Sequence, residues 1–168
     1  QLGADNEKRV REAIAPATLR AMQEVISAAW LPVELDIELT EAIARILGAE
    51  TNRAWSRDGM VRSLKGGMLG PMFQGAVRIL GLRPSSIYKF APSGWKAVYK
   101  DCGSLRATQG DEMCAQLSAE DVPGVMTASR TYFEGIAGAL EGVLTLCRVE
   151  GSVTVTDIDR TARRVVLE

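Results

Sequence analysis

Three cysteines are the side chains of this sequence best suited to covalent or metal chemistry. Cys102, Cys114 and Cys147 are separated by 12 and 33 residues, so they lack the CxxC pairing that indicates a zinc site. An odd number of widely spaced cysteines is typical of buried thiols in a reducing compartment and not of a disulfide framework. We therefore expect no bound metal and a cytoplasmic location.

The sequence contains no histidine. This excludes Ser-His-Asp and Cys-His triads, His-ligated haem, HExxH zinc sites and facial-triad iron sites. Pairs of carboxylates could still act as acid and base. Six acidic residues, however, lie in apparent turns, where solvated side chains are the rule: Asp101, Asp111, Glu112, Asp121, Asp157 and Asp159. We expect that the protein is not an enzyme and needs no cofactor, with a histidine-free enzyme as an alternative.

Two groups of glycines fail to match phosphate-binding motifs. Residues 66–71 do not fit GxxxxGK[ST], and they are expected to form a turn between helices or a flexible lip over a pocket. Gly135, Gly138 and Gly142 lie within a helical pattern, where each costs about 1 kcal/mol relative to Ala. Their spacing places them on one narrow face. This face could pack tightly on the protein's own sheet, form a subunit contact or provide a groove for a slender apolar ligand.

The composition indicates a single folded domain. The chain has 168 residues, 46% hydrophobic and 24% charged, with a net charge of −1. Without a basic excess we expect no nucleic-acid partner, and no apolar run approaches the roughly 20 residues of a membrane span. The polar start is unlike a secretory signal. The missing initiator Met and the apolar final residues suggest a fragment of a longer protein.

Helical patterns fill the first half of the chain. They predict helices over Glu7–Ala15, Ala17–Ala29 and Ile37–Leu47, with a break at residues 30–32 and Gly48 as a C-terminal cap. Glu50–Leu64 is compatible with a helix, and Pro71 opens another. Residues 84–99 are expected to form one or two short helices interrupted at Pro92 and Gly94.

After Gly103 the apolar period changes from 3.6 to 2, which predicts strands. One hairpin joins Ser104–Thr108 to Glu112–Ser118, and a second joins Ser152–Thr156 to Arg163–Leu167. Between them, an apolar stripe predicts a long helix over Ser129–Cys147. The expected fold is therefore α+β: N-terminal helices, then an antiparallel sheet of two hairpins with an amphipathic helix between them. Within this single domain, residues 1–35 form a helical extension and residues 36–168 the core.

Several sequence features of the second half carry a family resemblance. Gly94-Trp95-Lys96-Ala97-Val98-Tyr99 is followed by Cys102-Gly103-Ser104, a hairpin, a Val122-Pro123 break, the glycine-bearing helix from Tyr132 and strands ending in Val165-Val166-Leu167. This order resembles the superfamily that contains 4-vinyl reductase sensor domains, TRAPP transport-particle subunits and haem nitric-oxide-binding domains. Within it, the sequence is most similar to a myxobacterial paralogous family of unknown function. The resemblance covers about Leu39–Leu167.

The resemblance implies an antiparallel sheet flanked by helices, often in a dimer, with an apolar ligand, an acyl chain or a haem held between helices and sheet. This chain lacks the proximal histidine of the haem proteins and the paired cysteines of the zinc-bearing sensors. Of the ligand sites found in these families, only the apolar pocket is expected in this chain. Its expected lining is Met72, Phe73, Trp95, Tyr99, Phe133 and Leu140.

Two functions follow as expectations. The first is a non-catalytic sensory or regulatory module that binds a small apolar ligand and acts through a homodimer or a protein partner. The second is a protein-interaction or scaffold module with a filled core and no ligand.

Overall fold

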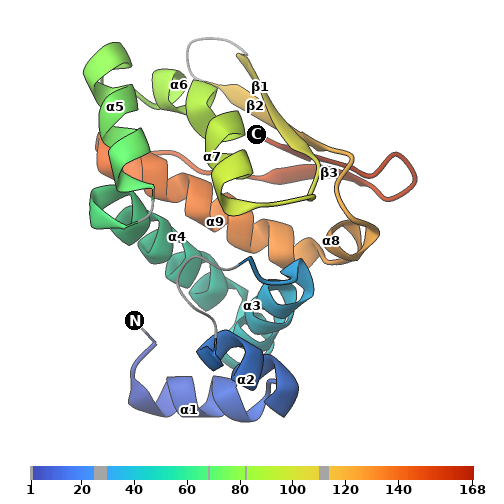
Figure 1. The fold of residues 1–168 in the computed structure, drawn as a ribbon. Coiled ribbons are helices and arrows are strands. Elements are labelled where there is room, and N and C mark those ends of the chain that lie inside the picture. The colour runs from blue at the N-terminus through green and yellow to red at the C-terminus, as the bar shows by residue number, and fades with distance from the viewer. Residues whose placement is uncertain (1, 25–29, 68, 82, 110–113) are drawn as a thin grey trace.

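The computed structural model describes residues 2–24, 30–67, 69–81, 83–109 and 114–168. It confirms an α+β fold, in which helices pack against a four-stranded antiparallel sheet (Figure 1). The first part of the chain forms α1 (Ala4–Glu12), α2 (Pro16–Glu24), α3 (Val33–Leu47), α4 (Ala49–Gly66), α5 (Gly70–Leu80), α6 (Pro84–Ile87), the 3₁₀ helix η1 (Tyr88–Phe90) and α7 (Ala91–Val98). The second part forms β1 (Ser104–Gln109), β2 (Ala115–Glu120), α8 (Gly124–Ala128), α9 (Arg130–Cys147), β3 (Val155–Asp159) and β4 (Arg164–Leu167).

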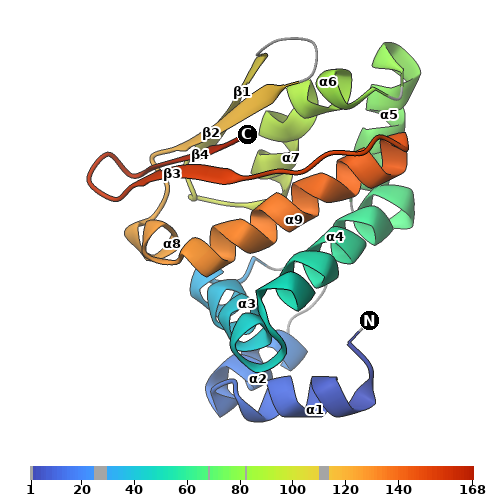
Figure 2. The ribbon, with the colours of Figure 1, turned by 180° about the vertical axis from the view of Figure 1, so that it is seen from behind.

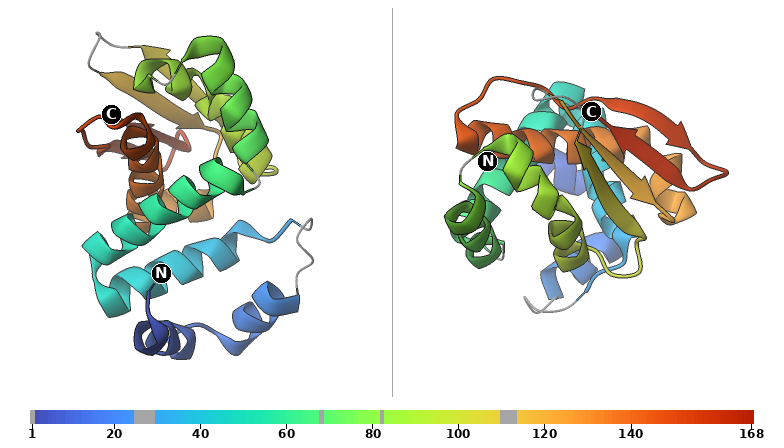
Figure 3. Two further views of the ribbon diagram at one scale, coloured as in Figure 1. Left: turned by 90° about the vertical axis from the view of Figure 1, so that its left-hand side faces the viewer. Right: turned by 90° about the horizontal axis from the view of Figure 1, so that it is seen from above.

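The molecule is arranged in tiers (Figures 2 and 3). The sheet and α5 to α7 lie at one end, α4 and α9 run through the middle, and α1, α2 and α3 lie at the other end. At the lower end Val10, Ile14, Ala42 and Ile43 form a small buried cluster of their own. None of the helices formed by the described residues is long and apolar enough to cross a membrane.

Several helix boundaries differ from the sequence expectation, and the first helix covers Ala4–Glu12 in place of the expected Glu7–Ala15. Helix α3 begins at Val33 and not at Ile37, because Pro32 supplies its extended N-cap residue. Pro92 and Gly94 do not interrupt a helix, since Pro92 lies in the first turn of α7, where a missing N–H costs nothing. The interruption falls at η1 instead. The predicted end of the second helix, residues 25–29, lies outside the described residues.

The long helix α9 starts as its sequence indicates. Ser129 is the N-cap, and its Oγ accepts a hydrogen bond from the Tyr132 N–H at 3.2 Å. The short helix α8 was not expected, because Val122-Pro123 predicts only a break before the long helix. Pro123 is the N-cap of α8, and its carbonyl accepts the Met126 N–H at 3.0 Å.

The sheet has the order β1-β2-β4-β3, with every neighbouring pair antiparallel. Its inward face follows the strand alternation, with Leu117 opposite Leu167 and Ala119 opposite Val165, all four buried. The second hairpin differs from its prediction. Strand β3 spans Val155–Asp159 and so continues three residues past its expected end at Thr156, and a register shift between Val155 and Asp157 breaks the alternation. The expected turn of the first hairpin, Gly110-Asp111, lies outside the described residues.

Candidate ligand cavity

A cavity of about 140 Å³ lies between the sheet and the helices α4, α5, α7 and α9. Apolar side chains make up almost its entire wall. The lining comprises Met60, Leu64, Leu69, Met72, Phe73, Ala76, Ile87, Tyr88, Phe90, Ala91, Gly94, Trp95, Val98, Tyr99, Leu105, Ile136, Ala139, Leu140, Val143 and Leu167. A wall of this kind repels water and favours apolar molecules.

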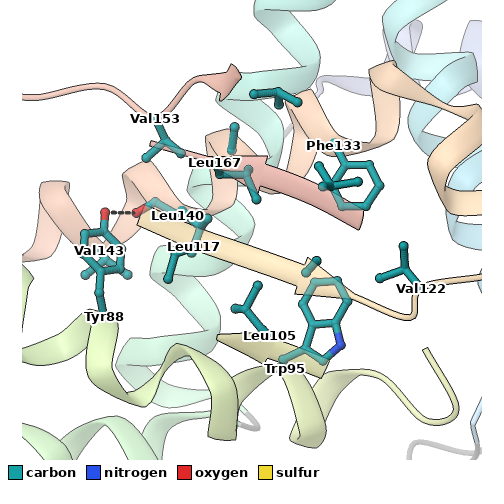
Figure 4. Close-up of a cluster of buried hydrophobic side chains, with 14 of the residues drawn as sticks. Tyr88, Trp95, Leu105, Leu117, Val122, Phe133, Leu140, Val143, Val153 and Leu167 are labelled. Carbon is teal, nitrogen blue, oxygen red and sulfur yellow. Dashed lines mark hydrogen bonds between the residues drawn. The ribbon is translucent and has the colours of Figure 1, made fainter. Parts of the chain in front are cut away.

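The three polar side chains of the wall already have hydrogen-bond partners in the protein. The Tyr88 hydroxyl donates to the Leu140 carbonyl at 3.2 Å (Figure 4). The Trp95 indole N–H donates to the Cys102 carbonyl at 3.2 Å. The Tyr99 hydroxyl lies 2.8 Å from the Tyr132 hydroxyl. These bonds occupy the N–H and O–H donors of the wall, so a polar group entering the cavity would lose its water and find no free donor.

Local sequence explains how the outer wall is built. Helix α5 begins with Pro71 in its first turn, and the next two residues, Met72 and Phe73, line the cavity. Gly94 of α7 faces Met72, whose Cε would lie 3.6 Å from a β-carbon added at position 94. Trp95 lies on α7, and Tyr99 lies one turn later, as the C-cap residue of this helix. Their ring centroids are 4.4 Å apart. The aromatic and methionine residues therefore form one continuous wall.

The structure brings together five of the six residues expected to line a pocket: Met72, Phe73, Trp95, Tyr99 and Leu140. Phe133 does not line it. Its side chain is 0% exposed, packed in the core between α9 and the sheet, with its ring edge-on to Tyr132 at a centroid distance of 6.0 Å (Figure 4). Phe133 shares the apolar stripe of α9, but the cavity begins one turn further along the helix, at Ile136.

Other lining residues were not singled out from the sequence. Ile136, Ala139 and Val143 come from α9, while Leu105 and Leu167 come from the sheet. Periodicity assigns such positions to a buried face, but it cannot tell which part of that face borders an empty space.

The three helix glycines face α4 and not the sheet. A β-carbon added at Gly138 would lie 2.5 Å from the Arg53 carbonyl oxygen, and one at Gly142 would lie 2.9 Å from that of Arg57. At Gly135 the nearest atom would be Thr40 Cγ2, at 3.2 Å. These glycines therefore permit close packing of two helices within the chain. The sheet is therefore not the element against which these glycines pack.

An ion-pair network holds the same two helices together. The Arg53 guanidinium donates to Glu134 at 2.5 Å, to Glu141 at 2.5 Å and to the Val153 carbonyl at 2.6 Å. Burial opposes the charged form of Arg53, but the two carboxylates outweigh it and raise the pKa of the guanidinium. All of these charged groups bind one another within the protein, so the network stabilises the fold.

A chain of hydrogen bonds runs from the cavity wall to α3. The Tyr132 hydroxyl donates to Asp36 at 2.8 Å and also contacts the Tyr99 hydroxyl. Although part of Asp36 is accessible, the surrounding protein shields its carboxyl group, and this burial raises its pKa more than the Tyr132 hydrogen bond lowers it. Burial likewise raises the pKa of both tyrosines. These hydrogen bonds therefore hold the end of α7 against α9 and α3.

The three cysteines differ in their exposure to solvent. The buried Cys102 thiol donates to the Lys100 carbonyl at 3.2 Å, Cys147 is half-buried, and Cys114 is exposed. Burial raises the pKa of Cys102 and Cys147, which disfavours the reactive thiolate. Among the described residues no group of three histidine, cysteine or acidic side chains could hold a metal ion.

Comparison with known proteins identifies no relative of this chain. No protein-family model matches the chain, and neither curated proteins nor solved structures show a significant match. The resemblance drawn from the sequence therefore stays a prediction.

Proposed function

We propose that this chain is a non-catalytic sensory or regulatory module that binds a small apolar ligand in the cavity between α5, α7 and α9. The observation that carries the proposal is the cavity itself, about 140 Å³ of space walled by apolar side chains. Natural cores contain few voids larger than a water molecule, because each void sacrifices packing contacts. A bound apolar ligand would restore those contacts.

The size and chemistry of the cavity define the ligand class. An engineered cavity of about 150 Å³ with a similar apolar lining stays dry and binds benzene. The hydrogen bonds of Tyr88, Trp95 and Tyr99 occupy the N–H and O–H donors of these side chains, so none of them is free to bind a polar head. We therefore infer a neutral ligand the size of one aromatic ring or a short hydrocarbon chain.

Sequence features support the rest of the proposal. The absence of histidine supports a binding function over an enzymatic one, and the scattered thiols support a cytoplasmic location. The resemblance to sensor domains supports action through a homodimer or a protein partner.

Thermal unfolding with toluene and phenol tests the ligand class. We expect toluene to raise the Tm and phenol to raise it less, because moving the phenol hydroxyl from water to an almost wholly apolar wall costs about 1–3 kcal/mol. Native mass spectrometry of protein purified from cells should show a co-purifying small molecule. Absence of both a toluene effect and a co-purifying ligand would instead support the scaffold function.

A cavity-filling substitution supplies the control. Ala139→Leu places three extra carbons against the cavity, so it should abolish the toluene effect while the protein stays folded. Ala17→Leu adds the same atoms at an exposed position of α2 and should leave the toluene effect unchanged. Equal responses in both variants would show that toluene acts elsewhere.

A further inference from the structure

A second hollow, of about 580 Å³, lies where the start of α3 meets the end of α7. We call it the α3–α7 groove. Its lining comprises Met22, Trp30, Leu31, Pro32, Val33, Glu34, Asp36, Ala97, Val98, Tyr99, Lys100, Asp101, Cys102 and Pro123. Val98 and Tyr99 also line the apolar cavity, so they form the wall between the two spaces.

Exposed apolar side chains gather in this groove. Trp30 is 52% exposed, Leu31 39% and Val98 36%. Large apolar side chains that converge on one hollow indicate a surface that another molecule covers. A tryptophan in such a position is the residue type that most often dominates binding energy at protein interfaces.

The exposed charges of the groove are predominantly negative. Glu34 and Asp101 contribute exposed carboxylates, Asp36 adds a carboxyl group that accepts the Tyr132 hydroxyl, and Lys100 is the single cation of the described lining. The excess acidity is local, since the chain as a whole has a net charge of −1. The three acids are not grouped as a metal site, so they suit a partner whose positive charges are spread out.

We propose that the α3–α7 groove is the docking surface for a short segment of a partner protein that combines apolar and basic side chains. The apolar side chains would pack against Trp30, Leu31 and Val98, and lysine or arginine would pair with Glu34 and Asp101. Cation–π contact with Trp30 would add to the attraction. A second copy of this chain fits less well, because a two-fold contact through this groove would set the same carboxylates against each other. Phosphates of nucleic acid would be repelled in the same way.

Synthetic peptides test this inference without a cavity ligand, so the result is independent of the proposed function. The probe is a fluorescein-labelled, amidated peptide of alternating Lys and Leu, with a Glu and Leu counterpart, followed by fluorescence anisotropy. We expect the Lys and Leu peptide to bind and the counterpart to show no binding. Added salt should weaken the interaction, as it does for exposed ion pairs.

Two variants of the groove locate the site. Trp30→Ala should weaken peptide binding by about tenfold or more. Glu34→Gln combined with Asp101→Asn removes two charges without changing side-chain shape, and it should weaken binding and reduce its salt dependence. The matched control pairs Val149→Ala with Glu150→Gln, which alters one exposed apolar and one exposed acidic residue next to the C-terminal end of α9. This control should bind like the unmodified chain.

The inference is overturned by any of three results. These are no binding of the Lys and Leu peptide, equal binding of the Glu and Leu peptide, or an equal loss of affinity in the groove variants and in the control. Because Trp30 is exposed and the charge substitutions are isosteric, all variants are expected to fold, which circular dichroism verifies before binding is measured.

Discussion

Gly138 of α9 lies so close to Arg53 of α4 that a β-carbon at position 138 would come within 2.5 Å of the Arg53 carbonyl oxygen. The obstacle is backbone, which cannot rotate away as a side chain can. The spacing of α4 and α9 is therefore set by the absence of a side chain at this position.

Replacing this glycine should separate the two helices. We expect Gly138→Ala to lower the free energy of unfolding by about 1–3 kcal/mol, since the overpacking exceeds the gain in helix propensity. Urea unfolding followed by circular dichroism measures the change.

Gly59→Ala on α4 is the matched control, because a β-carbon there would lie 3.9 Å from the nearest atom, the flexible Arg62 side chain. It should stabilise the protein by about 0.5–1 kcal/mol through helix propensity alone. Equal effects of the two substitutions would contradict the close packing at Gly138.

The Arg53 network gives a second prediction. Arg53→Met keeps much of the side-chain volume but leaves Glu141, with 12% of its side chain exposed, without its main cation. We expect a loss of about 2–3 kcal/mol in the free energy of unfolding, because a shielded carboxylate would remain poorly paired. Arg57→Met is the comparison. Arg57 is 42% exposed and lies 4.0 Å from Glu141, so its removal should cost less than about 1 kcal/mol.

Enlarging the cavity gives a third prediction. Leu64→Ala removes a buried lining residue and should lower the free energy of unfolding by about 2–5 kcal/mol. Added toluene should recover part of that loss, because a ligand that binds only the folded state stabilises it.

Leu117→Ala provides the comparison for the enlarged cavity. Leu117 is equally buried in the sheet but does not line the cavity. Its substitution should be similarly destabilising, and toluene should recover less of the loss than it does in Leu64→Ala. Calorimetry with and without toluene distinguishes the two variants.

A fourth prediction concerns pH. The pKa of Asp36 is raised in the folded protein above its ordinary value of 3.8, so the folded state holds a proton at this site more readily than the unfolded state. Between pH 3.8 and the pKa of Asp36 in the folded protein, the contribution of this residue to the free energy of unfolding therefore decreases as the pH rises and increases as the pH falls. Asp36→Asn keeps an oxygen to accept the Tyr132 hydroxyl but cannot ionise. Stability measured from acidic to neutral pH should favour the variant increasingly as the pH rises, and an unchanged profile would contradict the raised pKa.

Much of the fold could be predicted from the sequence because the longest elements carry strong periodic patterns. Helix α9 begins within one residue of its expected start, since the apolar stripe and the Ser129 cap agree. Short elements carry less information. Helix α8 is only five residues long, too short for a period to show. The irregular register of β3 near Val155 is a property of strand pairing that the strand's own residues do not reveal.

The site was less predictable than the fold, for physical reasons. Aromatic and methionine residues beside glycine and proline breaks did indicate where packing is irregular, and five of the chosen six line the cavity. Phe133 is also aromatic, but its side chain is completely buried among its neighbours. Whether a given apolar side chain meets a neighbour or a void depends on the distance between elements, as the approach of α9 to α4 at Gly138 illustrates.

The placement of β4 between β2 and β3 has a consequence for how the protein folds. Each hairpin joins strands that are close in sequence, but Leu117 pairs with Leu167, across about fifty residues that include all of α9. Closing so long a loop costs conformational entropy, and this cost arises before the new strand contacts can compensate for it. The two hairpins should therefore form early and separately, and their union across α9 should set the folding rate.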